Sequence, residues 1–204
     1  MSYKNVTISG LPGGGSTTLL KLLKEQLAHE GWRGFSGGEF MRAYALEHGS
    51  FEEQKGIHHD ASPYSDDFDR QVDMDMRSKL QSEDRWIIES WLSGFLAQGL
   101  PNVLKVLVYC SDDAIRIDRI VNRDDISIDE AKEHIHQRTE TNLAKWRRMY
   151  TPEWNEWVVG NGNATAEEEI YFWKHDLYDL CIDTYGNSKE ETLQQVLDAL
   201  GIQT

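Results

Sequence analysis

Glycine and hydroxyl residues near the start of the chain form a segment that could bind phosphate. Residues 10–17 read Gly-Leu-Pro-Gly-Gly-Gly-Ser-Thr and directly follow an apolar run at residues 6–9. Glycine-rich loops of this kind surround a phosphate with backbone N–H groups, and the following helix adds the positive end of its dipole. The usual pattern, G-x-x-x-x-G-K-[ST], is matched except at the lysine, which is Ser16 here. The sequence therefore predicts a phosphate-binding loop (P-loop) whose missing positive charge must come from elsewhere.

This loop and one distant acid are the predicted ligands of a nucleotide and its metal ion. Thr17 places a hydroxyl where such loops hold Mg²⁺. Glu89 ends an apolar run, and its carboxylate is predicted to hold that ion, either as a direct ligand or by binding one of its ligands. The predicted nucleotide-binding residues are Gly10, Gly13, Gly14, Gly15, Ser16, Thr17 and Thr18. Two alternatives stay open: a glycine-rich turn that binds nothing, and a strand-end acid that faces water.

Basic residues in two segments could supply the charge that the loop lacks. Arg116, Arg119 and Arg123 recur at helical spacing, so they share one face of a predicted helix. The next predicted helix carries Arg138, Lys145, Arg147 and Arg148. Together the two groups could close over an ATP triphosphate and stabilise the charge that moves during phosphoryl transfer. The alternative is that both faces are solvated and pair with nearby acids.

Three other features could bind ligands but also have plainer interpretations. Arg42 could bind a monophosphate, or it could be a solvated arginine on a helix. Residues 58–60 read His-His-Asp, but no matching Cys or His partners exist, so solvated histidines are favoured over a zinc site. Four tryptophans are predicted to pack or to anchor a lid rather than to stack on a base: Trp146, Trp154, Trp157 and Trp173.

Short apolar runs alternate with helical patterns along the chain. The predicted strands cover residues 4–9, 34–37, 85–90, 103–109 and 179–184. The predicted helices cover residues 17–29, 38–48, 66–82, 112–122, 127–149 and 188–200, and residues 150–165 are predicted to be a loop with turns. This alternation predicts an α/β fold, in which a five-stranded parallel sheet has helices on both faces. If the strand order is 2-3-1-4-5, Glu89 lies beside the first strand.

A single domain is expected for 204 residues. Its predicted core comprises residues 1–49, 83–123 and 178–204. Polar insertions at about 50–82 and about 124–165 interrupt the alternation of strands and helices. Because ligands of open α/β sheets bind at the carboxyl ends of the strands, both insertions are predicted to be flaps over a site at that edge.

Composition narrows the possible partners and the cellular setting. The net charge of −14 argues against nonspecific binding to nucleic acid or to an anionic membrane surface. Cys110 and Cys181 provide no disulfide framework and no metal-binding spacing, so both are predicted to be free, buried thiols. No run approaches the roughly 20 apolar residues of a membrane span, and no signal peptide is recognised. The expectation is a cytoplasmic protein that is a monomer or a weak dimer.

Several motifs together resemble those of the nucleoside monophosphate kinases, and in particular the short archaeal-type cytidylate kinases. The loop is similar to the family's G-P-P-G-S-G-T-T-T, which also has a small hydroxyl residue in place of the lysine. Residues 36–42 resemble S-A-G-E-x-F-R, and residues 116–131 reproduce the arginine-rich pattern of the family's lid. Residues 178–184 resemble its closing Y-D-L-x-I-D-T, and residues 68–73 partly match a further helix. The likeness covers almost the whole chain.

The resemblance implies a P-loop NTPase fold and ATP-dependent phosphoryl transfer to a pyrimidine nucleoside monophosphate, CMP or dCMP, with Mg²⁺. It implies that the insertions at about 50–82 and about 124–165 are the acceptor-binding segment and the lid. It assigns to the acceptor side Ser36, Arg42, Asp69, Arg70 and Asp73. It assigns to the lid, near the transferred group, Arg119, Arg123 and Arg138.

Two departures from the family pattern concern the acceptor and the lid. Trp91 stands where the family has an arginine that binds the acceptor phosphate, and Lys145 with Trp146 replaces an Arg-Tyr pair. Loss of one charge-assisted hydrogen bond would weaken acceptor binding by about one to two decades. Two other functions therefore stay open. One is a kinase for a different small molecule, whose ring would suit an aromatic side chain, and the other is a non-catalytic nucleotide-binding pseudokinase.

Overall fold

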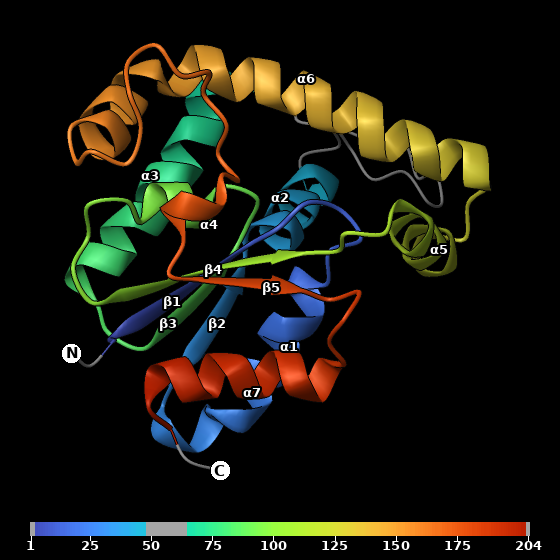
Figure 1. The fold of residues 1–204 in the computed structure, drawn as a ribbon, viewed down its shortest axis with the longest axis horizontal. Coiled ribbons are helices and arrows are strands. Elements are labelled where there is room, and N and C mark those ends of the chain that lie inside the picture. Colours follow the sequence, from blue (N-terminus) through green and yellow to red (C-terminus); the bar gives the residue numbers. More distant parts are fainter. Residues whose placement is uncertain (1–2, 48–64, 203–204) are drawn as a thin grey trace.

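A parallel β-sheet forms the centre of the molecule. In the computed structural model, which describes residues 3–47 and 65–202, five strands are hydrogen-bonded in the order β2-β3-β1-β4-β5 (Figure 1). The strands are β1 (Asn5–Ser9), β2 (Arg33–Ser36), β3 (Trp86–Glu89), β4 (Val103–Tyr109) and β5 (Leu180–Asp183). All neighbouring pairs are parallel. The predicted fold class and strand order are confirmed.

The middle strand β1 is buried on both faces. All five of its residues are buried, because helices cover the sheet from both sides. Val6 and Ile8 pack into an apolar cluster on one face. On the other face, the hydroxyl of Ser9 lies 3.2 Å from that of Ser93. Along β1 the apolar Val6 and Ile8 alternate with the buried polar residues Asn5, Thr7 and Ser9.

Two groups of helices cover the two faces of the sheet (Figure 1). One face is covered by α1 (Ser16–Gln26) and α7 (Lys189–Leu200), whose leucines and valines share a cluster with Ile8. The other face is covered by α3 (Asp66–Ser82), α4 (Ser93–Leu96) and the long helix α6 (Ile128–Trp154). The second cluster is rich in aromatic rings, and Phe95 lies at its centre with contacts to four other rings.

Two further helices follow strands directly, and side-chain caps fix several helix starts. Helix α2 (Gly37–Glu47) follows β2, and α5 (Asp113–Asp124) follows β4. Asp112 caps α5 by accepting a hydrogen bond from the backbone N–H of Ile115. Ser127 and Ser188 cap α6 and α7 with capping boxes. Short 3₁₀ helices occur at Ala28–Glu30 and His175–Leu177.

The predicted loop at residues 150–165 is wrong over its first part. Helix α6 continues to Trp154, and a π-helix follows at Asn155–Val159. Tyr150 breaks the regular helix (φ −113°, ψ 16°), so Pro152 stands in the first turn of a new helical segment, where its missing N–H costs little. Tyr150 and Trp154 are fully buried against Phe95. Aromatic burial therefore maintains a helix that the local Pro, Asn and Gly signals do not predict, and the predicted packing role of the tryptophans is confirmed.

Other sequence predictions have simple outcomes. No helix within residues 3–47 and 65–202 is long and apolar enough to cross a membrane. Cys110 and Cys181 are free thiols; the first is buried and the second is half-buried. The segment His58-His59-Asp60 lies outside the described residues.

Candidate active site

The glycine-rich loop lines a cavity of about 540 Å³ at the carboxyl edge of the sheet. Gly13 and Gly15 have left-handed backbones, with φ of 78° and 103°, which side chains other than glycine rarely adopt. At Gly10, a Cβ atom would lie 2.5 Å from the backbone oxygen of Val108 on β4. The loop therefore needs glycine both to turn and to pack closely against the sheet.

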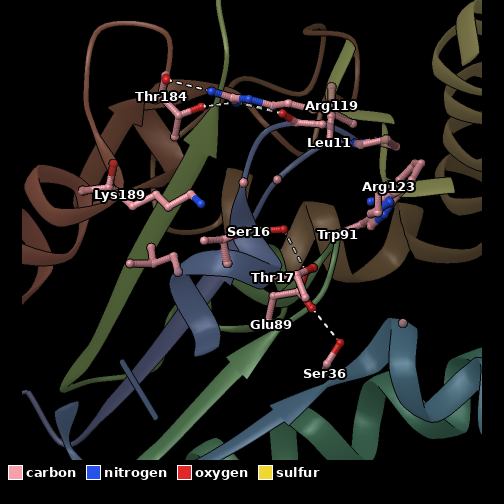
Figure 2. A pocket seen from close by; sticks show the side chains of 18 of the residues that line it. Leu11, Ser16, Thr17, Ser36, Glu89, Trp91, Arg119, Arg123, Thr184 and Lys189 are labelled. Carbon is pink, nitrogen blue, oxygen red and sulfur yellow. Dashed lines mark hydrogen bonds between the residues drawn. The ribbon is translucent and has the colours of Figure 1, made fainter. Parts of the chain in front are cut away.

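Glu89 joins the P-loop to the end of the neighbouring strand. Its Oε1 accepts a hydrogen bond from the Ser16 hydroxyl at 2.8 Å, and its Oε2 accepts one from the Ser36 hydroxyl at 2.8 Å (Figure 2). The parallel register explains this contact, because Glu89 pairs with Ile8 on one side and with Ser36 on the other. The side chain that replaces the usual lysine thus binds a buried carboxylate beside the cavity.

Arg119 attaches helix α5 to the P-loop. Its Nη1 donates to the backbone oxygen of Gly13 at 3.0 Å and to the hydroxyl of Thr184 at 2.7 Å. Its Nη2 donates to the backbone oxygen of Thr184 at 3.0 Å. The Thr184 hydroxyl in turn donates to the backbone oxygen of Gly14 at 2.9 Å. One guanidinium therefore connects the loop with the residue that follows β5 (Figure 2).

Of the two predicted basic groups, Arg119, Arg123 and Arg138 line the cavity. Arg123 is exposed and pairs with Asp124, and Arg138 on α6 lies over the ring of Trp91. The other basic residues of α6 bind elsewhere. Lys145 pairs with Asp69, whereas Arg147 and Arg148 pair with Glu169 and Asp66.

The predicted acceptor residues fall into three groups. Ser36 lines the cavity beside Glu89. Arg42 is carried by α2, and its side chain lies outside the described part of the structure. Asp69, Arg70 and Asp73 do not line this cavity but contact α6, and their role toward an acceptor stays a prediction.

A network of charged and polar groups connects α3 with α6. Lys145 donates to Asp69 at 2.7 Å, the Tyr150 hydroxyl donates to Asp73 at 2.5 Å, and Arg70 pairs with Glu153. Burial raises the pKa of Asp73 to about 7, although the hydrogen bond from Tyr150 opposes this shift. Burial also raises the pKa of Asp69, while Lys145 opposes it. Asp73 therefore faces Asp69, Lys145 and Arg70 in addition to Tyr150.

The folded protein is expected to lose stability as pH rises from about 5 to about 8, and Asp73→Asn should weaken that loss. The folded state keeps a proton on Asp73 up to a pH near 7, whereas the unfolded chain releases it at about 4. The free energy of unfolding therefore decreases as pH rises through this range and levels off above it. Asparagine retains an oxygen that can accept the Tyr150 hydrogen bond, and it carries no charge to bury.

Thermal unfolding midpoints at about pH 5, 6, 7 and 8 test this expectation. The midpoint of the Asp73→Asn variant should fall less with pH than that of the wild type. Asp75→Asn is the matched control, because Asp75 is exposed on the same helix. If the Asp73→Asn midpoint falls as steeply as the wild-type midpoint, the proposed titration is wrong.

Sequence reasoning missed cavity residues that follow β5. Thr184, Asn187, Lys189 and Thr192 line the cavity from that side. Their position after a predicted strand could have indicated this role, since residues after the carboxyl ends of parallel strands lie at the ligand-binding edge. Asn122 and Asp118, on the same helix as Arg119, also line it.

Comparison with known proteins identifies the family of this chain. A family model described as an AAA domain matches residues 6–141. The cytidylate kinase of Methanosarcina acetivorans is 32% identical over 146 residues, which cover 71% of this chain and 77% of that protein. This chain belongs to the cytidylate kinase family. A second family member, from Methanopyrus kandleri, is 27% identical over 206 residues and covers 96% of this chain and 93% of its own.

Membership in the cytidylate kinase family confirms the resemblance and the prediction of a P-loop phosphotransferase. A solved gluconokinase from Sinorhizobium meliloti is similar in fold, with a TM-score of 0.53. It is 11% identical, and the match covers 97% of this chain and 91% of that one. At this identity the likeness shows the fold alone, so the acceptor of this family member must be argued from the site.

Proposed function

We propose that this protein transfers the terminal phosphoryl group of ATP to CMP or dCMP in the presence of Mg²⁺. The observation that carries the proposal is one cavity into which the P-loop, Glu89 and three arginines project, in a member of the cytidylate kinase family. Phosphoryl transfer depends mainly on position and on neutralised charge, so this set of groups is sufficient for it.

Residues on both sides of the P-loop line the cavity, which suggests where the two nucleotides lie. Toward β5 and α7 it is lined by Thr184, Asn187 and Lys189, and this half would take the base and ribose of ATP. Toward β2 and β3 it is lined by Ser36, Ser90 and Trp91, and this half would take the acceptor. The P-loop lies between the two halves, where the phosphates would meet.

The residues present fit a Mg²⁺ ion beside the loop. The Thr17 hydroxyl and the Glu89 carboxylate belong to residues that line the same cavity (Figure 2). Mg²⁺ commonly binds one or two protein oxygens together with substrate phosphates and water. The carboxylate of Glu89 has lone pairs beyond the two that accept from Ser16 and Ser36. Thr17 and Glu89 would hold the ion, which would neutralise charge on the phosphates.

The groups of the chain would act by holding phosphates and donating to developing charge. Backbone N–H groups of the P-loop would bind the donor phosphates, and Arg119, Arg123 and Arg138 would surround the transferred group. Neither side of the cavity requires a strong base, because the attacking oxygen belongs to a phosphate that is already ionised.

A lid formed by α5 and the first part of α6 completes the proposal. Ile120, Ala131 and Ile135 form a small cluster that packs these two helices on each other. From Trp146 onward, α6 belongs to the aromatic core. This packing supports a lid shorter than the predicted insertion at about 124–165. Residues 48–64 of the predicted acceptor insertion lie outside the described residues, and its helix α3 packs on the core through Met76 and Leu80.

A panel of acceptors tests the proposal. Purified protein with ATP and Mg²⁺ should form ADP rapidly with CMP and dCMP, and slowly or not at all with AMP, GMP, gluconate or shikimate. Calorimetry with ATP in the absence of an acceptor separates a pseudokinase from a kinase of unknown acceptor. Tight ATP binding without turnover of any acceptor would favour the pseudokinase. Turnover of a non-nucleotide acceptor, with no turnover of CMP or dCMP, would favour a kinase for a different small molecule.

Lys189→Met is expected to raise the KM for ATP by about three- to tenfold with little change in kcat. Lys189 begins α7, and its side chain extends toward the P-loop in the donor half of the cavity (Figure 2). Its ammonium group would bind the donor and not the transferred group, so binding should change more than chemistry. Lys21→Met, an exposed lysine on α1 that does not line the cavity, is the control. Equal KM values in wild type and Lys189→Met would exclude this role.

A further inference from the structure

Trp91 and Arg138 come from different elements and meet at the cavity. Trp91 follows the end of β3 by two residues, and Arg138 lies near the middle of α6. The Cζ atom of Arg138 lies 5.0 Å from the centroid of the Trp91 ring, within the range of a cation–π contact. Both residues line the cavity, so the contact is part of the site itself.

Two buried rings hold Trp91 in place. Trp146 meets it edge-on, with 5.4 Å between centroids and an angle of 71°, and Trp173 does so at 6.1 Å and 68°. The indole N–H of Trp173 also donates to the backbone oxygen of Trp91 at 2.8 Å. Because Trp146 and Trp173 are buried and contact each other, Trp91 is a rigid platform rather than a mobile side chain.

A rigid ring can orient an arginine without using its donors. A guanidinium that stacks on an aromatic ring does so through its face, whereas its N–H groups lie in its own plane. Those in-plane N–H groups are suited to bind a phosphate with two parallel hydrogen bonds. The contact with Trp91 therefore restricts the position of the Arg138 guanidinium at the cavity.

We propose that Trp91 is a positioning residue that holds Arg138 over the acceptor half of the cavity, where the guanidinium, one of the three proposed to surround the transferred group, also binds the acceptor's phosphate. The inference rests on the proposed function. It explains how the acceptor half gains a cation although residue 91 is not an arginine: the charge comes from α6 and the ring fixes its direction. Trp91 thus acts through Arg138 and does not itself need to touch the acceptor.

A double-mutant cycle on acceptor affinity tests this proposal. Trp91→Leu should raise the KM for CMP about tenfold, with the KM for ATP unchanged. Trp91→Phe keeps an aromatic face and should restore most of the affinity. In an Arg138→Met background, Trp91→Leu should add little, because the ring then has no guanidinium to hold. Trp86→Leu is the control, since Arg33 lies 4.2 Å from the Trp86 ring at the opposite end of β3, outside the cavity.

Three results would overturn the proposal. An unchanged KM for CMP in Trp91→Leu would remove any role for the ring. An equal loss with and without Arg138 would show that Trp91 contacts the acceptor directly. A wild-type protein that does not bind CMP in calorimetry would overturn both this inference and the proposed function.

If the protein binds CMP but does not phosphorylate it, only the proposed function is contradicted. The double-mutant cycle can then be measured on the dissociation constant for CMP instead of on the KM. Thermal midpoints close to that of the wild type would confirm that each variant is folded.

Discussion

Replacing Glu89 by glutamine is expected to lower kcat about 10²- to 10³-fold while leaving the protein at least as stable as the wild type. Glu89 is a buried acid whose two oxygens accept hydrogen bonds from the hydroxyls of Ser16 and Ser36. Glutamine has nearly the same shape, and its amide can still bond to both hydroxyls, which are able to donate or accept. The substitution removes a buried negative charge, so it relieves a desolvation cost while it removes the acid proposed to hold Mg²⁺.

The combination of lower activity and unchanged or higher thermal midpoint distinguishes a catalytic acid from a structural one. Rates should be measured over a range of Mg²⁺ concentrations, and the variant should require more Mg²⁺ than the wild type. Glu83→Gln removes one negative charge outside the cavity and serves as the control. A kcat within about threefold of the wild type at saturating Mg²⁺ would refute the role of Glu89, since a proposed metal ligand should contribute several kcal/mol.

The sequence predicts the framework of the site because its signals there are local. The left-handed backbone angles of Gly13 and Gly15 are local requirements, and a buried strand precedes them. The close approach of Gly10 to Val108 on β4, in contrast, depends on the sheet. Glu89 could be predicted because the end of a strand beside β1 must lie near the loop. Arg119 was found from helical spacing, but its contacts with Gly13 and Thr184 depend on how α5 docks and could not be predicted.

The missed and wrong predictions share a physical cause, which is dependence on distant parts of the chain. Lys189 is one charged residue after a helix cap, and only the approach of β5 to the loop brings it to the cavity. The segment after Tyr150 contains Pro and Gly signals for a loop, yet burial of Trp154 against α4 and its neighbours maintains a helix. Trp91 was recognised as a departure from the family, but its contact with Arg138 needs the position of α6.

Helix α6 connects these features, because one element contributes to the cavity and to the core. Its first half carries Arg138 to the Trp91 ring. Its second half is fixed to α3 through Lys145 and Tyr150. An arginine on a long helix that is anchored at its far end is placed by packing that lies well away from the substrate. The position of Arg138 at the cavity therefore depends in part on the α3–α6 network, although Asp69 and Asp73 do not line the described cavity.

Arg119→Met is expected to lower kcat about 10²- to 10³-fold and to raise the KM for ATP. The guanidinium is half-buried and joins the backbone oxygens of Gly13 and Thr184, so its charge lies close to where the loop would hold the phosphates. Methionine keeps an unbranched apolar stem but has neither charge nor donors. Arg119→Lys keeps the charge and loses the fork of donors, and Thr184→Val keeps the arginine and loses the hydroxyl that it binds.

The three variants distinguish two roles of Arg119: stabilising charge on the transferred group, and fixing the P-loop against the end of β5. If the charge of Arg119 stabilises the transferred phosphoryl group, Arg119→Lys should retain within about tenfold of wild-type kcat, and Thr184→Val should affect KM more than kcat. Steady-state rates with varied ATP and saturating acceptor provide the measurement. If Arg119→Lys is as impaired as Arg119→Met, and Thr184→Val reproduces much of the same loss, the arginine acts mainly by fixing the P-loop against the end of β5. That result would transfer the charge-stabilising role to Arg123 and Arg138, which also line the cavity.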